Sequence, residues 1–164
     1  MNYETLEAVI VARLQGLAGI EVIPLPENDN DFKTPYTDAK VTVAYNSSTF
    51  ELSEDSFFVS QPEVIIMQLV FWSRRLRGST GIYQIINAVQ SKLQGWEPAA
   101  GTDKCKKIEL GHIKFESHVD DLWTYSQFIT TETMKIGQPD PVIEVISTEI
   151  KIKDEKGTIT IDVP

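Results

Sequence analysis

Two acids and a lysine near the C-terminal end of the sequence follow the order found in metal-dependent nucleases. Pro139 and Asp140 precede Glu149, Ile150 and Lys151. In that order the two carboxylates would hold Mg²⁺, and the lysine would orient or activate the attacking water. The chain, however, runs from the lysine straight into a predicted hairpin, and it is acidic and has no basic cleft. A small Mg²⁺-dependent PD-(D/E)xK-type nuclease therefore stays an alternative, and we predict no catalytic residue and no cofactor.

Two histidines and two aspartates form a second candidate site. His112 and His118 lie six residues apart on a predicted strand, so alternation should place both side chains on one face. Asp120 and Asp121 follow in the adjacent turn. The sequence lacks the helical ligand spacing and the H-x-x-x-H motif of zinc sites. We predict a solvated hairpin turn here and no metal site.

Cys105 is the single cysteine of the chain, and it lies among Lys104, Lys106 and Lys107. Neighbouring cations can lower the pKa of a thiol. No histidine lies near it in sequence, and a lone cysteine at the start of a strand is usually inert. One cysteine also excludes an intramolecular disulfide and a thiolate metal cluster.

A compact group of arginines lies in the block of residues 71–96, which reads FWSRRLRGSTGIYQIINAVQSKLQGW. Arg74, Arg75 and Arg77 follow a strongly apolar run, and Trp96 closes the block. Arginine suits interfaces because its planar fork binds carboxylates bidentately. We predict that these four residues contact another subunit or a partner, the alternative being that some of the arginines hold the loop together within one chain. An anion at the start of the following helix is a weaker alternative.

The elements around the arginines are strongly patterned. Residues 64–72 are apolar on both alternating faces, which is typical of a strand in the middle of a sheet covered on both faces. Glycines 78 and 81 indicate a turn, and Ser79 or Thr80 is expected to cap the next helix. One apolar stripe then predicts that helix; its residues are Ile82, Ile85, Ile86, Val89 and Leu93.

This block resembles the tail terminator proteins of Mu-like contractile-tailed phages. The resemblance extends over about residues 1–135 and includes an aromatic-rich strand at residues 122–128 and a V-x-V-x-Y strand at residues 40–45. The matching positions of the block are Phe71, Ser73, Arg74, Arg77, Gly78, Gly81, Tyr83, Ile86, Val89, Leu93 and Gly95.

The resemblance implies a structural protein and no enzyme. Copies of the chain, six in a ring, would cap the last ring of the tail tube and sheath, stop polymerisation and offer a docking face to the head–tail connector. DNA would only pass through the lumen. The protein would be assembled in the host cytoplasm and reside in the neck of the virion. A generic adaptor module is a further alternative.

Composition is consistent with one globular core. The chain has 164 residues, of which 41% are hydrophobic and 24% charged, and a chain of this length can bury about 70% of its unfolded surface. A net charge of −9 argues against a surface that grips nucleic acid, because such surfaces neutralise phosphates with cations. No stretch approaches the roughly 18 apolar residues of a membrane span, so we expect no membrane contact.

The predicted fold is α+β: a mixed, mostly antiparallel sheet of four to five strands with two helices packed on one face, plus a C-terminal β-hairpin. We expect helices over residues 2–17 and 82–93, strands over 20–23, 40–45, 64–72, 107–117 and 122–133, and loops over 27–38, 46–62 and 97–104.

The C-terminal part is predicted to be an arm. Residues 1–137 would form the core domain, and residues 138–164 a hairpin extension behind the proline-containing segment 138–141. Alternating residues leave the hairpin with one apolar face. We expect this face to contact another subunit through Ile150, Ile152, Ile159 and Ile161, the alternative being pairing at the edge of its own sheet.

Overall fold

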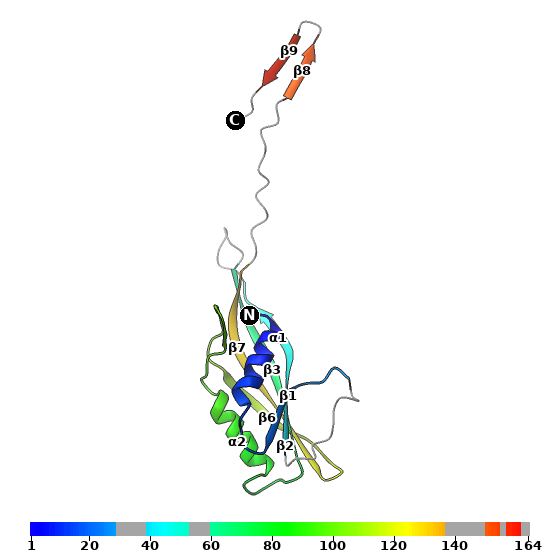
Figure 1. Cartoon of the computed structure of the whole chain (residues 1–164), viewed down its shortest axis with the longest axis vertical. Helices are drawn as coiled ribbons and strands as arrows, with labels where there is room; N and C mark the ends of the chain where they lie inside the picture. The colour runs from blue at the N-terminus through cyan, green and yellow to red at the C-terminus, as the bar shows by residue number, and fades with distance from the viewer. Residues whose placement is uncertain (29–38, 53–59, 137–149, 155–156, 162–164) are drawn as a thin grey trace.

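The computed structural model describes residues 1–28, 39–52, 60–136, 150–154 and 157–161, the last two ranges by their backbone only. One five-stranded sheet carries two helices, and two further pairs of strands form small sheets of their own (Figure 1). In chain order the elements are α1 (Tyr3–Leu14), β1 (Ile20–Pro24), β2 (Ala39–Phe50), β3 (Ser60–Ser73), α2 (Ile82–Leu93), β4 (Ala99–Ala100), β5 (Asp103–Lys104), β6 (Glu109–Val119), β7 (Leu122–Ile136), β8 (Ile150–Asp154) and β9 (Gly157–Ile161).

The main sheet has the strand order β1-β2-β3-β7-β6. Only β1 and β2 are parallel; the other neighbours pair in antiparallel fashion. The strand β3, which the sequence predicts to be central, lies in the middle of this order. The α+β prediction, including five strands and a C-terminal hairpin, is confirmed.

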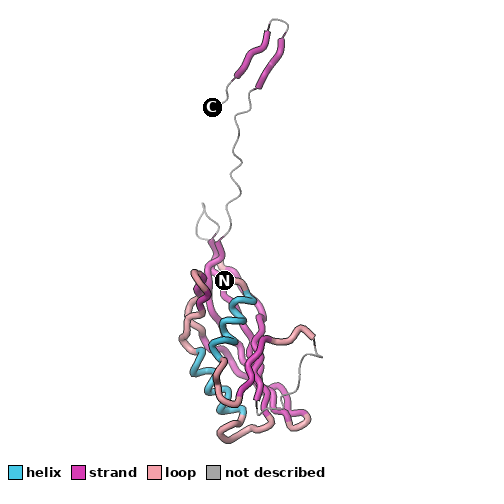
Figure 2. The backbone as a smooth tube through the Cα atoms, in the orientation of Figure 1, coloured by secondary structure: helices cyan, strands magenta, loops and turns pink. Residues whose placement is uncertain are grey.

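The core lies between the helices and one face of the sheet (Figure 2). Every second residue of β3 is buried on this face, including Ile65, Met67, Leu69 and Phe71. The apolar stripes of α1 and α2 join the same cluster, represented by Leu6, Ile10, Leu14, Ile82, Ile85 and Val89. Both helices therefore cover the same side of the sheet.

The opposite side of the sheet differs from the prediction. Val64, Ile66 and Val70 of β3 point away from the helices and are half-buried, and so is Phe128 of β7. We call these four residues the open face. In the described part of the chain no helix covers this face, since α1 and α2 lie on the other side, yet Lys40, Thr42 and Ser126 on this face are buried. The expectation of a strand covered on both faces is therefore met by helices on one face only. An apolar pattern shows that a face avoids water, but it does not identify what covers that face.

The expected loop over residues 46–62 is strand at both of its ends, and residues 53–59 lie outside the described residues. β2 continues to Phe50 and β3 begins at Ser60, with Phe50 opposite Glu63. The polar run after Tyr45 enters the sheet through a β-bulge between Tyr45 and Ser47, which absorbs one extra residue. The loop expected at residues 97–104 contains the two-residue strands β4 and β5. Most of the loop expected at residues 27–38 lies outside the described residues.

The turn between β6 and β7 forms where the sequence predicts it. Asp120 and Asp121 both have positive φ angles, 51° and 59°. Two left-handed residues in a two-residue connection give the hairpin turn whose twist matches the flanking strands.

The first helix ends at Leu14, earlier than predicted, and Asn2 caps it by accepting the Thr5 backbone N–H at 2.7 Å. None of the described helices is long and apolar enough to cross a membrane.

Candidate interaction surface

The three arginines lie in the loop that joins β3 to α2, and all three side chains are exposed. Arg75 holds this loop together. Its backbone N–H donates to the Ser73 hydroxyl at 3.1 Å, its Nη1 donates to the Thr80 hydroxyl at 3.2 Å, and its carbonyl accepts the Ile82 N–H at 2.8 Å. Arg75 therefore has an internal role in addition to its exposure.

Arg74 and Arg77 have no such role in the part of the chain that the structure describes. Neither forms an ion pair or a side-chain hydrogen bond with a described residue. An exposed guanidinium presents its donors in a planar fork suited to carboxylates. These two side chains are available to acids of another molecule.

The capping prediction for α2 is wrong. The N-cap is Gly81, with no side-chain cap hydrogen bond, and the Thr80 hydroxyl accepts from Arg75 instead. Gly81 sits so close to Arg77 that an added Cβ would lie 2.4 Å from the Arg77 carbonyl carbon. Position 81 has no room for a side chain because the backbone of the arginine loop lies directly against the start of α2.

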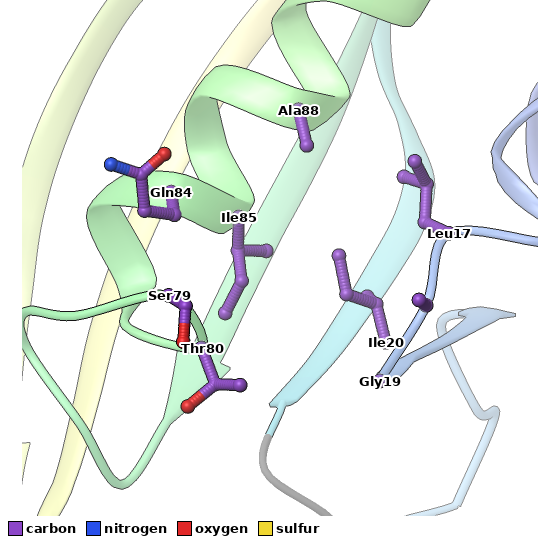
Figure 3. A pocket seen from close by; sticks show the side chains of 9 residues that line it. Leu17, Gly19, Ile20, Ser79, Thr80, Gln84, Ile85 and Ala88 are labelled. Carbon is purple, nitrogen blue, oxygen red and sulfur yellow. The ribbon is translucent and has the colours of Figure 1, made fainter.

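A pocket of about 110 Å³ lies beside the start of α2 (Figure 3). Leu17 and Ile20 line it from one side, and Ile85 and Ala88 from the other, with the Ser79 and Thr80 hydroxyls at its edge. No charged side chain is among its lining residues. The lining of this pocket therefore gives no support to the weaker alternative, an anion bound at the start of this helix.

Aromatic side chains gather beside the arginine loop, on the helix side of β6 and β7. Ser73, the last residue of β3, pairs with Trp123, so Arg74 follows directly at this end of the sheet. Phe115 and Tyr83 are about half exposed, at 48% and 42%. The aromatic contacts link Phe115 to Trp123 (6.1 Å between ring centroids) and Tyr125 (5.4 Å), Tyr125 to Tyr83 (6.1 Å), and His118 to Trp123 (4.0 Å).

We define the arginine–aromatic end as Arg74, Arg77, Tyr83, Phe115, Trp123 and Tyr125. Arginine, tyrosine and tryptophan are the residue types enriched in protein interfaces and in their energetic hot spots. The sequence signal for this cluster is the alternation of Trp123 and Tyr125, which places both on one face, together with Tyr83 in the first turn of α2. Tyr83, Trp123 and Tyr125 belong to the stretches that carry the family resemblance, whereas Phe115 does not, and no pattern in the sequence predicts that these side chains meet.

The two tyrosines also interact through their hydroxyl groups. The Tyr125 hydroxyl donates to the Tyr83 hydroxyl at 3.5 Å. This hydrogen bond, followed by desolvation, raises the pKa of Tyr125 to about 12. A phenol that must stay protonated to donate is harder to ionise.

Trp96 does not join the arginine–aromatic end. It follows the C-terminal end of α2, about 18 Å along the helix axis from the arginine loop. The ring is half-buried against the core, and the Arg13 guanidinium lies 5.3 Å from its centroid. Its expected place in an interface stays a prediction.

The four isoleucines predicted for the arm lie on β8 and β9. The strand register places Ile150 opposite Ile161 and Ile152 opposite Ile159. Cross-strand partners share one face of a sheet, so these four positions share a face of the hairpin. The segment 138–141, expected to separate the arm from the core, lies outside the described residues, and the arm itself stays a prediction.

The two histidines lie on opposite faces of the sheet, contrary to the prediction. His118 stacks on Trp123 on the helix side, whereas the ring of His112 lies 5.3 Å from Phe128 of the open face. Irregular pairing between Leu110 and Ile113, and again after Phe115, shifts the register of β6. A bulge reverses the alternation that equal spacing implies.

No group of three or more potential metal ligands occurs among the described residues. Asp140 and Glu149 of the nuclease pattern lie outside them. Cys105 is buried, and burial raises the pKa of its thiol, which contradicts the idea of an activated thiolate.

A buried carboxylate at the other end of β3 has no counterpart in the sequence predictions. Glu63 is fully buried, and the Tyr3 hydroxyl donates to its Oε1 at 2.6 Å. Lys135 Nζ lies 3.8 Å from Oε2. The hydrogen bond to Glu63 is the main cause of a raised pKa of Tyr3. This contact ties α1 to the central strand.

Fold and surface together define a small α+β domain that presents an arginine–aromatic end and an open sheet face. The chain belongs to the Gp37 protein family, which matches residues 10–151. No curated protein matches it. Among solved structures it is similar to a chain of the "Virion of native gene transfer agent (GTA) particle", with 12% identity and a TM-score of 0.47 over 78% of this chain and 86% of that chain.

Proposed function

We propose that this protein is a structural component of a phage-type virion and acts as a tail terminator. In this role six copies form a ring that caps the tail tube and sheath, stops polymerisation and presents a docking surface to the head–tail connector. The ring resides in the neck of the virion, and DNA passes through its lumen. The protein works by contact with its neighbours and not by catalysis.

The observation that carries the assembly role is the pair Arg74 and Arg77. Both are exposed, and neither pairs with an acid of the described chain. Arg74 follows Ser73, which pairs with Trp123 of the arginine–aromatic end. The chain has 24 acids against 15 lysines and arginines, so a second copy offers ample carboxylates. Arginine contacts across a heterologous interface, repeated by rotation, close a ring.

The tail terminator role rests on the sequence pattern of residues 71–96. The residues of that pattern have identifiable structural tasks here. Gly81 allows the close approach to Arg77, and Tyr83 meets Tyr125 of the aromatic-rich strand. All residues of the arginine–aromatic end except Phe115 thus lie in the stretches that carry the family resemblance.

The test is the mass of the purified full-length protein in solution, measured by light scattering and native mass spectrometry, alone and with purified tail tubes. We expect a ring in electron micrographs, either free or at one end of a tube, and tubes that no longer elongate when capped. A protein that stays monomeric and leaves tube growth unchanged would contradict the proposal. Magnesium-dependent cleavage of DNA by the same preparation would instead favour the nuclease alternative.

A further inference from the structure

We propose that the β8–β9 hairpin of one copy packs its isoleucine face against the open face of a second copy's sheet. The inference rests on the proposed function in one respect: it requires that copies of this chain associate. The surfaces that meet are the isoleucine face of the hairpin and the open face, and the molecule that covers the open face is a second copy of this chain.

The open face continues as an apolar surface to the end of the sheet. Met134 and Ile136 of β7 extend it, with exposed fractions of 52% and 71%. Met134 pairs with Pro62 across the strands, and Val64 and Ile66 follow along β3. Exposure therefore increases toward the end at which β7 finishes. A surface of this kind marks a protein contact in a soluble chain.

One part of this side of the sheet is buried, and another part carries a hollow. Lys40, Thr42 and Ser126 lie on this side and are buried. Beside Val64 there is a hollow of about 170 Å³. Its walls come from β3, β7, the start of β6 and the segment before it, namely Val64, Lys106, Lys107, Glu109, Thr130, Thr131 and Glu132.

The hollow is lined mainly by polar residues. Four of its seven lining residues are charged, and two of these, Lys106 and Glu132, form an ion pair. The apolar part of the open face lies beside the hollow, along Val64, Ile66, Met134 and Ile136. We expect the partner to cover this apolar part with an apolar face of its own.

The hairpin has the complementary pattern. Its register gives one face four isoleucine positions and the other face Lys151, Lys153, Thr158 and Thr160. A two-stranded hairpin by itself is marginally stable in water, and a third layer or strand is needed to hold it. The five-stranded sheet does not include it. Its apolar face requires a surface such as the open face, packed at about 10 Å as two stacked sheets are.

The connecting segment is long enough to reach a second copy. Residues 137–149 can span about 45 Å at roughly 3.4 Å per residue. A connection between adjacent antiparallel strands of one sheet needs only about two to five residues, so the hairpin is not expected to continue its own sheet as the next strand. Pro139 and Pro141 also remove two backbone donors from the segment. Each copy carries one hairpin and one open face. In a ring, every copy can therefore place its hairpin on one neighbour and receive the hairpin of the other neighbour on its open face.

The test is cysteine cross-linking in the full-length protein. The variant carries Val64→Cys on the open face and Ile152→Cys on the hairpin; Val64 is half-buried, so the fold should tolerate the change. The matched control combines Val64→Cys with Thr158→Cys, whose register position lies on the other face of the hairpin. Under mild oxidation we expect a ladder of covalent multimers, at least tenfold stronger than in the control.

Two results would overturn the inference. The first is a disulfide formed within single chains, seen as a faster-migrating monomer on a non-reducing gel, because the hairpin would then cover its own sheet. The second is equal cross-linking in variant and control while the reduced protein keeps its ring mass; in that case the ring of the proposed function stands without this contact. A reduced protein that is monomeric throughout contradicts both proposals, so the mass measurement separates the two failures.

Discussion

Gly81 and Arg77 are in backbone contact: a methyl group on the Gly81 α-carbon would come within 2.4 Å of the Arg77 carbonyl carbon and 2.5 Å of its oxygen. Backbone atoms cannot yield as a flexible side chain can. We expect Gly81→Ala to force the arginine loop away from α2 and to lower the free energy of unfolding by about 1–3 kcal/mol. Urea denaturation measures the change. Ser79→Ala, an exposed site in the same loop, should have no comparable effect, and equal midpoints for both variants would contradict this account.

Arg74→Ala and Arg77→Ala should weaken ring formation without unfolding the monomer. Each removes an exposed guanidinium that has no acidic partner in the described chain. Truncation of an interfacial arginine commonly raises the dissociation constant by ten-fold or more, corresponding to about 1–2 kcal/mol. Light scattering over a concentration series gives this constant. Lys92→Ala, at the far end of α2, is the control for loss of an exposed cation, and variants that assemble like wild type would exclude these arginines from the interface.

The Tyr83–Tyr125 hydrogen bond gives the arginine–aromatic end a pH signature. The pKa of Tyr125 is raised to about 12 from an ordinary value of about 10. Because the folded pKa is the higher one, the stabilisation is complete below about pH 10 and is lost as the pH rises toward 12. In Tyr83→Phe we expect the pKa of Tyr125 to fall. Phenolate absorbance during an alkaline titration follows it, and an unchanged last titration step would show that Tyr83 is not the cause.

Deletion of residues 141–164 should leave a chain that folds cooperatively but forms no rings. The five-stranded sheet and both helices lie within the first 136 residues. Circular dichroism during heating checks the fold of the truncated chain, and light scattering checks its mass. A truncated chain that fails to fold would place the hairpin in its own core and remove the arm from the account.

Tyr3→Phe should destabilise the protein by about 1–3 kcal/mol, because Glu63 Oε1 would lose its hydrogen bond while staying buried. Tyr45→Phe is the matched control, since its hydroxyl shares a hydrogen bond with Ser48 at an exposed position, 3.1 Å away. Thermal unfolding of the two variants under the same conditions gives the comparison. A loss of equal size in both would attribute the effect to the stacked rings of Tyr3 and Tyr45 and not to the carboxylate.

The sequence predicts the helices and strands of this fold better than it predicts what packs against each of their faces. The apolar run in β3 and the stripe of α2 identify a central strand and its covering helix, because both patterns have a period that matches one structure. The same run does not reveal that Val64 and Ile66 face away from any helix. Periodicity records which side chains avoid water and leaves open what they meet.

The errors at the site have local causes. His112 and His118 were expected on one face because alternation is regular in an ideal strand, and a bulge has no clear signature in β6. Ser79 and Thr80 were expected to cap α2 because their side chains suit the task, whereas Arg75 competes for the Thr80 hydroxyl. The contact of Tyr83 with Tyr125 joins residues far apart in the chain, and no spacing rule predicts it.

The pairing of β3 with β7 also determines when the core can close during synthesis. The β2–β3 hairpin can form as soon as Ser73 has left the ribosome, but the ladder from Ser60 to Ile136 must wait for nearly the whole core. Leu6 of α1 and Ile85 of α2 pack on the face that these strands build together, so the helices gain their full cover at the same late moment. Contacts between distant parts of a chain form slowly. One edge of β3 therefore stays unpaired until β7 emerges. The hairpin of β8 and β9 is synthesised only after every strand of the five-stranded sheet is available.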